Sequence, residues 1–496
     1  MNIPITVQDL LESIKKSDNG KSPGSDGLTR EFYIVFWNNI SELLFNSLIE
    51  GKEKGLLSPS QRQAVIKLLE KGKDKRFIKN LRPISLINYD TKILHKTLAD
   101  RLREVLPSLI SCDQTAYVKD RFLGESVRLI SDILETTKTF NIEGFMLTID
   151  IEKAFDSVEH NFLIATLKKL GFEGYFLDWI LVMLNKQESC VLNGGTSTGF
   201  FPLERGSRQG DPISAYLFIL VMETFFTLAK SNSNIKPLEI FNFKYLITSY
   251  ADDTTFFLKD INSAKIIFQI FDKFSKFSGL KVNKSTCQIA GIGVKNGVQE
   301  ALSGVQSVDL STDSIKILGV NFTYNGDIFI EKNFCNVIEK IEKVLSAWRW
   351  RYMTIAGKIT IFNSLAFSKI IFVTCLTAIP EKIVKQIEII QNEFIWEGKK
   401  PSVRYLTMVA DYADGGLKMI HVRAKFHSLK LAWVKRLFSN NFHPWMNIPK
   451  YFFKENVRFF PNIKNKFSKN LPTFYIQLIH AWTELNQEPI TPETVL

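Results

Sequence analysis

The spacing of apolar and polar residues changes twice along the chain, and the changes predict an α+β protein. Apolar residues recur at the spacing of amphipathic helices in the first 58 residues and again from Glu331 onward. Between these regions, short β-prone runs alternate with helix-prone ones. The helix-prone segments there begin near Thr91, Ser157 and Ala215.

The clearest strand pattern is a pair of β-prone runs within residues 245–258, YLITSYADDTTFFL. The runs flank Asp252 and Asp253, as expected for a hairpin with a tight polar turn. Adjacent carboxylates repel each other unless a cation lies between them, and Mg²⁺ binds through carboxylates and substrate phosphates. A solvated Asp–Asp turn is the plainer interpretation of this stretch on its own.

A second strand-like run, residues 145–149, ends at Asp150, and the pattern then becomes helical up to Gly171. A structural cap is one interpretation of an Asp at such a junction. Together with Asp252 and Asp253, however, Asp150 completes the minimum set of carboxylates for phosphoryl transfer by two metal ions. The pattern alone does not show that the three side chains meet.

The net charge of the chain predicts a polyanionic partner. The 496-residue chain has a formal net charge of +12, and such a balance suits nucleic acid. Eight Lys or Arg residues lie between Arg62 and Arg82, and they predict a strip that follows a phosphate backbone. A basic soluble protein without such a partner is the alternative.

Cysteine usage and the apolar runs exclude several classes of protein. The five cysteines are scattered singly, with no CxxC pair and no spacing typical of a zinc site. The N-terminus lacks the pattern of a signal peptide, and the longest apolar runs, 215–222 and 370–379, are too short to span a bilayer. We therefore expect an intracellular, reduced protein with no membrane partner.

Seven sequence blocks, taken in order, resemble the reverse transcriptase domain of LINE-type (non-LTR) retrotransposons. They span about residues 20–325, and the ordered set is specific where YADD alone would be weak. The blocks are KSPGSDGLTREFY from Lys21, LRPISLINYDTKILHKTLADRL from Leu81, LTIDIEKAFDSVEH from Leu147, RQGDPISAYLF from Arg208, YADD from Tyr250, SGLKVNKS from Ser278 and ILGVNF from Ile317.

The resemblance implies a right-hand polymerase fold, with fingers, a palm built on an antiparallel sheet, a helical thumb and a helical C-terminal extension. The implied boundaries are an N-terminal extension at 1–58, fingers at 59–144, a palm at 145–325 that includes part of the fingers at about 171–207, a thumb at 326–400, and a basic C-terminal extension at 401–496.

The resemblance also implies a catalytic centre made of carboxylates. Asp150, Asp252 and Asp253 would hold two Mg²⁺ ions, with Mn²⁺ as the alternative. Lys284 would protonate the departing pyrophosphate, although a solvated lysine is the plainer interpretation. The oligomeric state has no signal in the sequence.

Further residues are implied as contacts to nucleotide and nucleic acid. Arg82 would grip the incoming triphosphate with its planar guanidinium, and Phe155 matches a steric gate that excludes a ribose 2′-hydroxyl. A turn-capping Arg82 and a core Phe155 are the alternatives. The remaining residues are Arg208, Gln209 and Gly210 for the nucleotide, Leu318 and Gly319 for the primer end, and Lys21, Arg62, Lys67, Trp348 and Arg349 for template or other nucleic acid.

The function that the resemblance implies is RNA-directed DNA polymerisation, with an RNA template, a DNA primer and dNTPs as partners. A catalytically inactive RNA-binding scaffold is the main rival, and Phe155 argues against an RNA-templated RNA polymerase. Family members usually carry an endonuclease ahead of the polymerase, whereas about 20 residues precede the first block here. We expect an isolated polymerase segment without target cleavage, in the cytoplasm or nucleus as part of a retroelement ribonucleoprotein.

Overall fold

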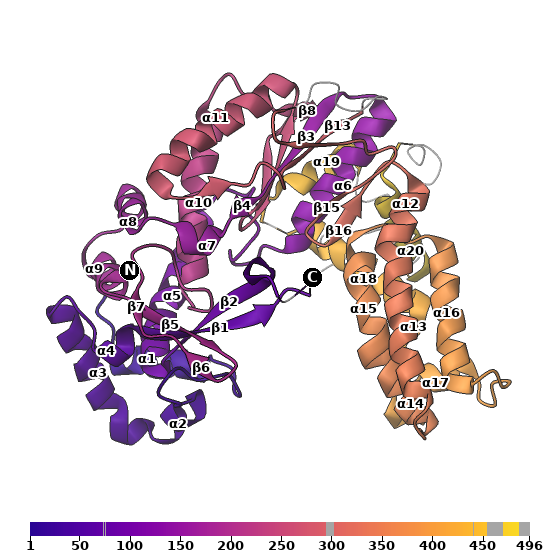
Figure 1. Ribbon diagram of the computed structural model, residues 1–496. Helices are drawn as coiled ribbons and strands as arrows, with labels where there is room; N and C mark the ends of the chain where they lie inside the picture. The colour runs from indigo at the N-terminus through magenta and orange to yellow at the C-terminus, as the bar shows by residue number, and fades with distance from the viewer. Residues whose placement is uncertain (73, 75, 294–301, 440, 454–469, 486–496) are drawn as a thin grey trace.

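The computed structural model describes residues 1–72, 74, 76–293, 302–439, 441–453 and 470–485, and it combines small sheets with many helices (Figure 1). The predicted α+β class is confirmed. Two members of the basic strip, Lys73 and Lys75, lie outside the described residues. The same holds for three stretches of the predicted C-terminal extension, 440, 454–469 and 486–496.

The first helices pack against the long helix α5, Tyr89–Leu109. The amphipathic face predicted near the N-terminus is confirmed, because Leu10 and Ile14 of α1, Val7–Lys15, are wholly buried and α1 contacts α5. The other helices of this part are α2 Arg30–Val35, α3 Trp37–Glu53 and α4 Pro59–Arg62.

A first sheet joins two distant parts of the chain. Strand β1, Gln63–Glu70, pairs antiparallel with β2, Leu81–Ile87, and parallel with β5, Glu188–Asn193. Lys67 and Arg82 of the basic strip therefore lie on neighbouring strands, while most of its other members fall in the sequence between β1 and β2. Two short strands extend this sheet beside β5, namely β6 Thr196–Ser197 and β7 Phe201–Pro202.

A second sheet has the strand order β10-β11-β3-β13-β14. Neighbours from β10 to β13 are antiparallel, whereas β14 is parallel to β13. The strand predicted at 145–149 and the hairpin within 245–258 are both confirmed. The strands are β3 Gly144–Ile149, β10 Ile247–Tyr250, β11 Asp253–Leu258, β13 Gln288–Ile292 and β14 Gln306–Val308.

The second sheet separates two hydrophobic cores, because successive side chains of a strand point to opposite faces. Leu147 and Phe256 lie in one core, whereas Met146 and Phe257 lie in the other. Both cores extend into helices. The first includes α10 Ser214–Ser231 and α11 Ile261–Ser278, and the second includes α6 Leu123–Phe140 and the C-terminal helices.

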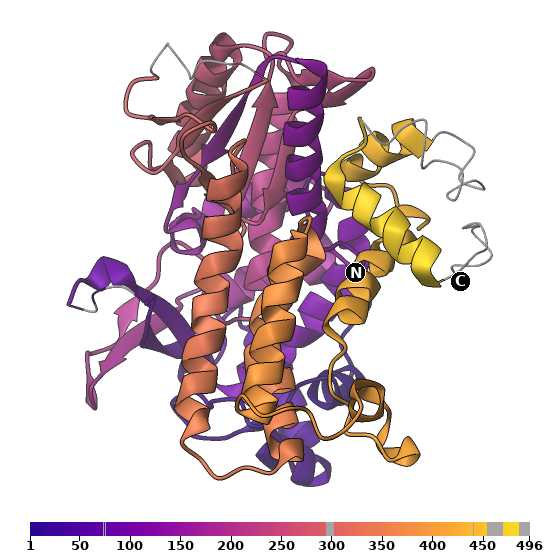
Figure 2. The same cartoon turned by 90° about the vertical axis from the view of Figure 1, so that its right-hand side faces the viewer.

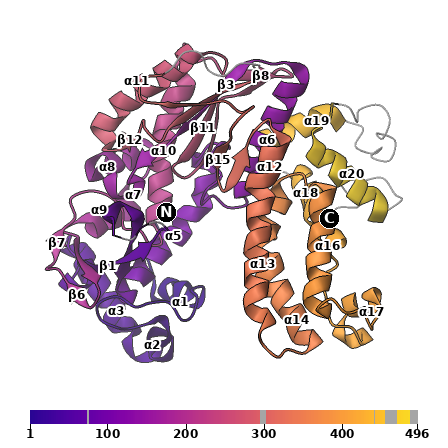
Figure 3. The same ribbon diagram turned by 45° about the vertical axis from the view of Figure 1, so that its right-hand side comes forward.

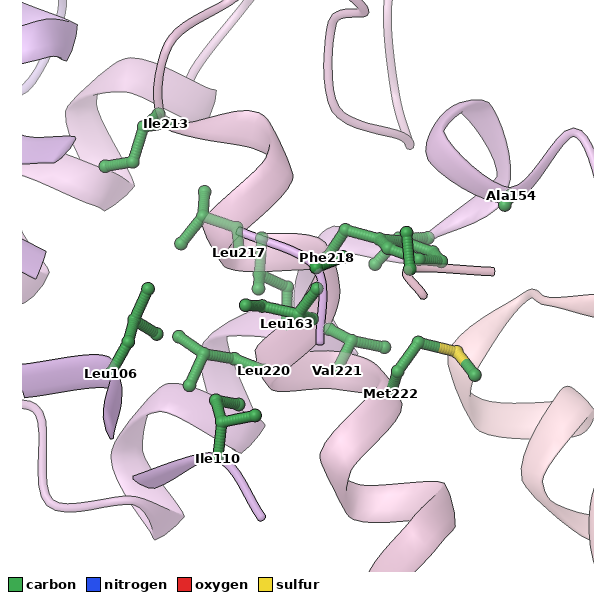
Figure 4. Packing of buried hydrophobic residues seen from close by; sticks show 14 of the residues in the cluster. Leu106, Ile110, Ala154, Leu163, Ile213, Leu217, Phe218, Leu220, Val221 and Met222 are labelled. Carbon is green, nitrogen blue, oxygen red and sulfur yellow. The ribbon is translucent and has the colours of Figure 1, made fainter. Parts of the chain in front are cut away.

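Helix α10 is apolar on all sides because it lies at the centre of the first core, where Leu217 and Leu220 pack with Leu106 and Leu163 (Figure 4). By length and composition, α10 and the continuous helix Ile355–Leu376 are each able to cross a bilayer. The prediction that the apolar runs here are too short was wrong, since both helices extend beyond those runs. Core helices of soluble proteins have the same length and composition, and 61% of α10 is buried inside the protein.

From residue 326 onward the described chain is helical, as the pattern after Glu331 predicted. Helices α13, the helix Ile355–Leu376 and α16 lie side by side (Figure 2 and Figure 3) and share one core. The helices of this part are α12 Gly326–Ile330, η2 Glu331–Cys335, α13 Asn336–Arg349, α14 Ile355–Ile361, η3 Phe362–Phe367, α15 Ser368–Leu376, α16 Glu381–Trp396, α17 Tyr405–Val409, η4 Tyr412–Asp414, α18 Val422–Leu437, η5 Pro444–Met446, α19 Asn447–Phe453 and α20 Thr473–Leu485.

The remaining helices and strands before residue 326 are short. They are η1 Ile78–Asn80, β4 Ile151–Glu152, α7 Ala154–Ser157, α8 His160–Lys169, α9 Gly174–Leu184, β8 Leu238–Ile240, β9 Phe243–Tyr245, β12 Lys281–Val282, β15 Ile315–Ile317 and β16 Val320–Phe322.

A buried charge cluster connects α6 to the helical part. Arg128 and Asp132 of α6 are both buried, and Arg128 Nε donates to Asp132 Oδ1 at 3.2 Å. Arg128 Nη1 donates to the carbonyl of Leu376 at 2.9 Å, and the Tyr475 hydroxyl donates to Asp132 Oδ2 at 2.5 Å. One ion pair thus fixes α6, α15 and α20 to one another.

The C-terminal end of α15 is capped by donors from α18. Lys430 Nζ donates to the carbonyl of Thr374 at 2.9 Å and also to that of Thr377, and Trp433 Nε1 donates to Cys375 at 2.8 Å. The last carbonyls of a helix have no partner within the helix, so these donors satisfy them. Trp433 is buried and so belongs to the core.

Replacing Asp132 by Ala would lower the free energy of unfolding by about 3–5 kcal/mol, because the buried Arg128 would lose its counter-charge. Chemical denaturation followed by circular dichroism measures this loss. The control is Glu239→Ala, which removes a solvent-exposed ion pair to Lys244 and should change stability by less than about 1 kcal/mol. Equal midpoints for the two variants would contradict the assigned role of the cluster.

Candidate active site

The pairing of β3 with β11 brings two predicted carboxylates to the same end of the second sheet. The antiparallel register places Thr254 opposite Ile149. The next positions toward the strand ends are Asp253, the first residue of β11, and Asp150, which follows β3 directly. The two residues are far apart in sequence, and only this register makes them neighbours.

The hairpin turn that carries Asp252 contains a strained residue, Ala251, that requires support. Tyr250 and Asp253 pair across the turn, so only Ala251 and Asp252 connect the strands. Ala251 has a φ of +58°, in the left-handed region that costs a residue with a Cβ about 1–2 kcal/mol. Its side chain is buried. Contacts from elsewhere must therefore offset this cost.

Gln114 supplies that support from the loop between α5 and α6. Its side chain is wholly buried, and its Oε1 accepts from the backbone N–H of Ala251 at 2.9 Å and of Ala116 at 2.9 Å. Its Nε2 donates to the carbonyl of Ala251 at 3.3 Å and to Ser249 Oγ at 3.3 Å. The sequence analysis missed Gln114, because no local pattern connects it to a hairpin so distant in sequence.

The carboxylates act on one another electrostatically. Loss of hydration, together with the charges of Asp252 and Asp150, raises the pKa of Asp253 to about 6. Burial also raises the pKa of Asp252, with an added contribution from Asp150, whereas the positive charge of Arg82 lowers it. Within the described residues no ion pair neutralises any of the three carboxylates. A bound cation would relieve this repulsion.

The three side chains offer the oxygen ligands that Mg²⁺ and Mn²⁺ prefer. The three carboxylates do not surround one point. In the described chain no group of three or more His, Cys, Asp or Glu residues lies close enough to hold a metal ion. Asp150 Oδ2 instead accepts from Thr286 Oγ1 at 2.5 Å. The donor chemistry of the three side chains fits divalent ions.

Phe155 lies on α7 beside the end of β3. Lys153, with a φ of +46°, turns the chain into α7. The ring of Phe155 is half-buried and stacks on Phe218 of α10, with ring centroids 4.7 Å apart. The support from Phe218 holds the ring in place while part of it remains accessible.

Gln209 and Gly210 hold β2 close to this part of the site. The N–H of Ser85 donates to the carbonyl of Gln209 at 2.7 Å, and the Gln209 side chain hydrogen-bonds Asp156. Gly210 has a φ of +108°, and a Cβ there would lie 2.8 Å from the Ser85 carbonyl oxygen. Arg82 is exposed on β2. The structure thus brings Gln209, Gly210 and Arg82 near the carboxylates.

Two of the predicted contact residues, Arg208 and Arg62, have side chains that hydrogen-bond the main chain. Arg208 is buried, and its Nη2 donates to the carbonyls of Arg62 and, at 2.9 Å, of Glu188. Only 12% of the Arg62 side chain is exposed, and it donates to the carbonyls of Leu57 at 3.1 Å and Lys186 at 2.7 Å. The two arginines thus tie the chain just before β1 to the start of β5, and their contacts to nucleotide and template stay predictions.

Leu318 and Gly319, predicted at the primer end, form the turn of the hairpin β15–β16. Their φ values of +49° and +83° suit a tight two-residue turn. A Cβ on Gly319 would lie 3.2 Å from the ring of Phe372 on α15, so the turn rests against the helical part. Primer contact at this turn stays a prediction.

The other predicted residues lie on the surface, and Lys284 is in the segment beside Asp150, because Asn283 N–H donates to the Asp150 carbonyl at 3.0 Å and Thr286 to its carboxylate at 2.5 Å. Lys284 is exposed, and its ammonium lies 5.6 Å from the ring centroid of Phe268. Lys21 pairs with Asp18 at 3.4 Å. Lys67, Trp348 and Arg349 lie on β1 and α13, where Lys67 and Arg349 are exposed and Trp348 is half-buried.

A cleft of about 430 Å³ beside the hairpin turn was also missed by the sequence analysis. Tyr117 and Tyr250 line it, with ring centroids 6.3 Å apart. Arg103 and Lys119 add positive charge to its wall. Aromatic and basic side chains therefore continue outward from the carboxylates.

Comparison with known proteins gives a family match over residues 70–322, half of the chain, described as reverse transcriptase (RNA-dependent DNA polymerase). The transposon TX1 149 kDa protein of Xenopus laevis is 29% identical over 97% of this chain, and the R2DM Pol polyprotein of Drosophila melanogaster is 28% identical over 68%. The polymerase of the jockey element of Drosophila funebris is 24% identical over 69%. The chain spans 38%, 31% and 38% of these relatives' lengths.

Among solved structures, telomerase of Candida tropicalis in complex with a fragment of telomeric RNA aligns with a TM-score of 0.41 and 13% identity, over 86% of this chain and 68% of that one. Telomerase of Candida albicans, also with telomeric RNA, aligns with a TM-score of 0.39 and 11% identity, over 79% and 62% of the two chains.

Replacing Gln114 by Leu would leave the N–H of Ala251 buried without a partner and lower the free energy of unfolding by about 1–3 kcal/mol. Hydrogen exchange followed by mass spectrometry should show faster exchange of the amides at 249–254. The control is Gln306→Leu, because Gln306 is an exposed glutamine on β14. Unchanged exchange at the hairpin in the Gln114 variant would show that the turn does not depend on this side chain.

Proposed function

The chain belongs to the family of reverse transcriptases, the RNA-dependent DNA polymerases, and we propose that it extends a primer 3′-hydroxyl on an RNA template by two-metal phosphoryl transfer. The resemblance to LINE-type (non-LTR) retrotransposon enzymes is confirmed by the TX1, R2 and jockey relatives. The observation that supports activity in this chain is the register of β3 and β11, since it places Asp150 and Asp253 at one end of the sheet.

The right-hand fold of this family allows the parts of the chain to be assigned. We infer that the sheet containing β1 and β2 belongs to the fingers and that the sheet containing β3 and β11 is the palm. The assigned ranges are an N-terminal extension at 1–58, fingers at 59–144 with about 171–207, palm at 145–325, thumb at 326–400 and a basic helical extension at 401–496.

Asp150, Asp252 and Asp253 would hold the divalent cations, Mg²⁺ or Mn²⁺. When bound, such ions activate the primer hydroxyl and neutralise the phosphates. The raised pKa values of Asp252 and Asp253 support this assignment, because they reflect like charges held together with little water. Gln114 keeps the turn that carries Asp252 in position.

The nucleotide would bind between the carboxylates and β2. Arg82 is exposed there, and its charge already acts on Asp252, so a triphosphate would bridge the two. Guanidinium groups bind phosphate oxygens in a planar, bidentate manner. The close approach of Gly210 to Ser85 leaves room beside Gln209, whose amide would hydrogen-bond the nucleotide. Catalysis then consists of positioning and charge stabilisation.

Phe155 would set the choice of sugar. Its ring is fixed from behind by Phe218 and remains partly accessible near Asp150. A sugar bound against this ring has no space for a 2′-hydroxyl, so dNTPs are the substrates. The net charge of +12 and the exposed Lys67 suit an RNA template and a DNA primer, within an intracellular retroelement ribonucleoprotein.

Replacing Asp252 by Asn would lower the rate of primer extension by about 10²–10³-fold or more, because a carboxylate that would hold the divalent cations is lost. The assay uses oligo(dT) on poly(rA) with Mg²⁺ and dTTP. Asp272→Asn, an exposed position on α11, is the control and should retain the rate. A wild type that binds the primer–template without extending it would establish the inactive RNA-binding scaffold instead.

Replacing Phe155 by Val would lower the preference for dTTP over UTP by about tenfold or more, because removal of the ring opens space for the 2′-hydroxyl. Single-nucleotide incorporation with each substrate gives the ratio of kcat/KM values. Phe162→Val is the matched control, since Phe162 is also half-buried but packs on Phe274 of α11. Unchanged sugar preference at position 155 would refute the gate.

A further inference from the structure

A buried His–Asp pair joins α5 to the segment that leads into α10. His95 Nδ1 on α5 lies 2.6 Å from Asp211 Oδ2, and only 1% and 4% of the two side chains are exposed. Nε2 of His95 is also buried and has no hydrogen-bond partner among the described residues. Asp211 is therefore the one hydrogen-bond partner that orients this imidazole within the described chain.

The Asp211 carboxylate lies among several positive charges. Burial raises its pKa, but the charge and hydrogen bond of His95, the N–H of Ile213 and the charge of Arg208 outweigh burial and lower it. Lys92, on the same helix as His95, also interacts with the charge of Asp211. Replacing a buried ion pair by well-packed apolar side chains is often neutral for stability. A buried pair of this kind therefore matters chiefly through the segments that it holds together.

The segment that ends at Asp211 holds the main chain on both sides of the proposed nucleotide site. The N–H of Ser207 donates to the carbonyl of Phe155 at 2.7 Å, and the carbonyl of Gln209 accepts from the N–H of Ser85 at 2.7 Å. Phe155 is the proposed gate, and Gln209 is the proposed nucleotide contact. The segment thus connects α7 with β2, and Asp211 attaches its end to α5.

We propose that the His95–Asp211 pair sets the position of Gln209 and thereby the affinity for the incoming nucleotide. This inference rests on the proposed function. Both side chains are buried, so they are positioning residues that act through Gln209. One residue separates β2 from α5, so the pair also holds β2, and with it Arg82, against the same segment. Gln209 and Arg82 would then approach the nucleotide from fixed positions.

The first test measures nucleotide binding by the full chain with isothermal titration calorimetry. The enzyme carries poly(rA), Mg²⁺ and an oligo(dT) primer that ends in a dideoxynucleotide, so that no chemistry follows binding. Asp211→Asn and His95→Gln should each raise the dissociation constant for dTTP by about tenfold, because a misplaced group binds poorly. The double variant should bind no more weakly than Asp211→Asn, because the paired residues act as a unit.

The matched control is Asp132→Asn, which removes the charge from another buried carboxylate. Its side chain has 0% exposure, and it pairs with Arg128 of the same helix. This variant should bind dTTP as the wild type does. An equal loss of affinity in Asp132→Asn would overturn the proposal, because any broken buried pair would then have the same effect.

The second test separates positioning from a general loss of folding. In steady-state primer extension, Asp211→Asn and His95→Gln should raise KM for dTTP by about tenfold and leave kcat within about twofold. Poor folding instead lowers the concentration of active enzyme, so that only the apparent kcat falls. A lower kcat with an unchanged KM would therefore overturn the proposal. If Asp211→Asn does not fold, His95→Gln decides, because Asp211 then keeps its charge beside Arg208.

Failure of the proposed function gives a different set of results. A wild type that extends no primer, but whose dTTP affinity falls in the Asp211 and His95 variants, would refute the polymerase activity and support the positioning role. A wild type that extends primers with the same dTTP affinity and KM as both variants would refute the positioning role alone. A wild type that neither binds dTTP nor extends a primer would refute both.

Discussion

The confinement of like charges at the ends of β3 and β11 is the constraint on which the rest of the site depends. The register brings Asp150 beside Asp253, and loss of hydration together with the neighbouring charges raises the pKa of Asp253. The strands withstand this repulsion because both faces of the sheet are buried. Phe256 and Phe257 are fully buried in different cores, so separating the strands would expose both. The fold thus maintains a charge arrangement that a divalent cation relieves.

Buried polar side chains fix the geometry around these charges. A buried amide or guanidinium must find partners, and in doing so it fixes the main chain that supplies them. Gln114 holds the left-handed turn at Ala251, and Arg208 fastens β1 to β5. Neither side chain reaches the surface. These buried side chains fix the strands and turns, and the strands in turn hold exposed groups such as Arg82 near the carboxylates.

Buried polar side chains also connect the helical part to α6 beside the second sheet. The C-terminal end of the helix Ile355–Leu376 is fixed by Arg128, Lys430 and Trp433, all of them buried. Its N-terminal end follows residues 348–352, where the side chains of Trp350 and Tyr352 are exposed. One end of the helix is therefore anchored to α6, while the other presents rings and charges to solvent.

The sequence by itself determined the helical and strand periods, the Asp–Asp hairpin, the strand that ends at Asp150 and the family. These signals are local, since alternation, turn residues and motif spacing depend on residues close to one another in the chain. Only the tertiary structure decided that Asp150 meets Asp253 and that Gln114 supports the turn. It also decided that the side chains of Arg62 and Arg208 are largely enclosed. Each of them depends on contacts between residues distant in sequence. An exposed arginine can bind a ligand, whereas an arginine enclosed by β1 and β5, such as Arg208, holds the main chain together.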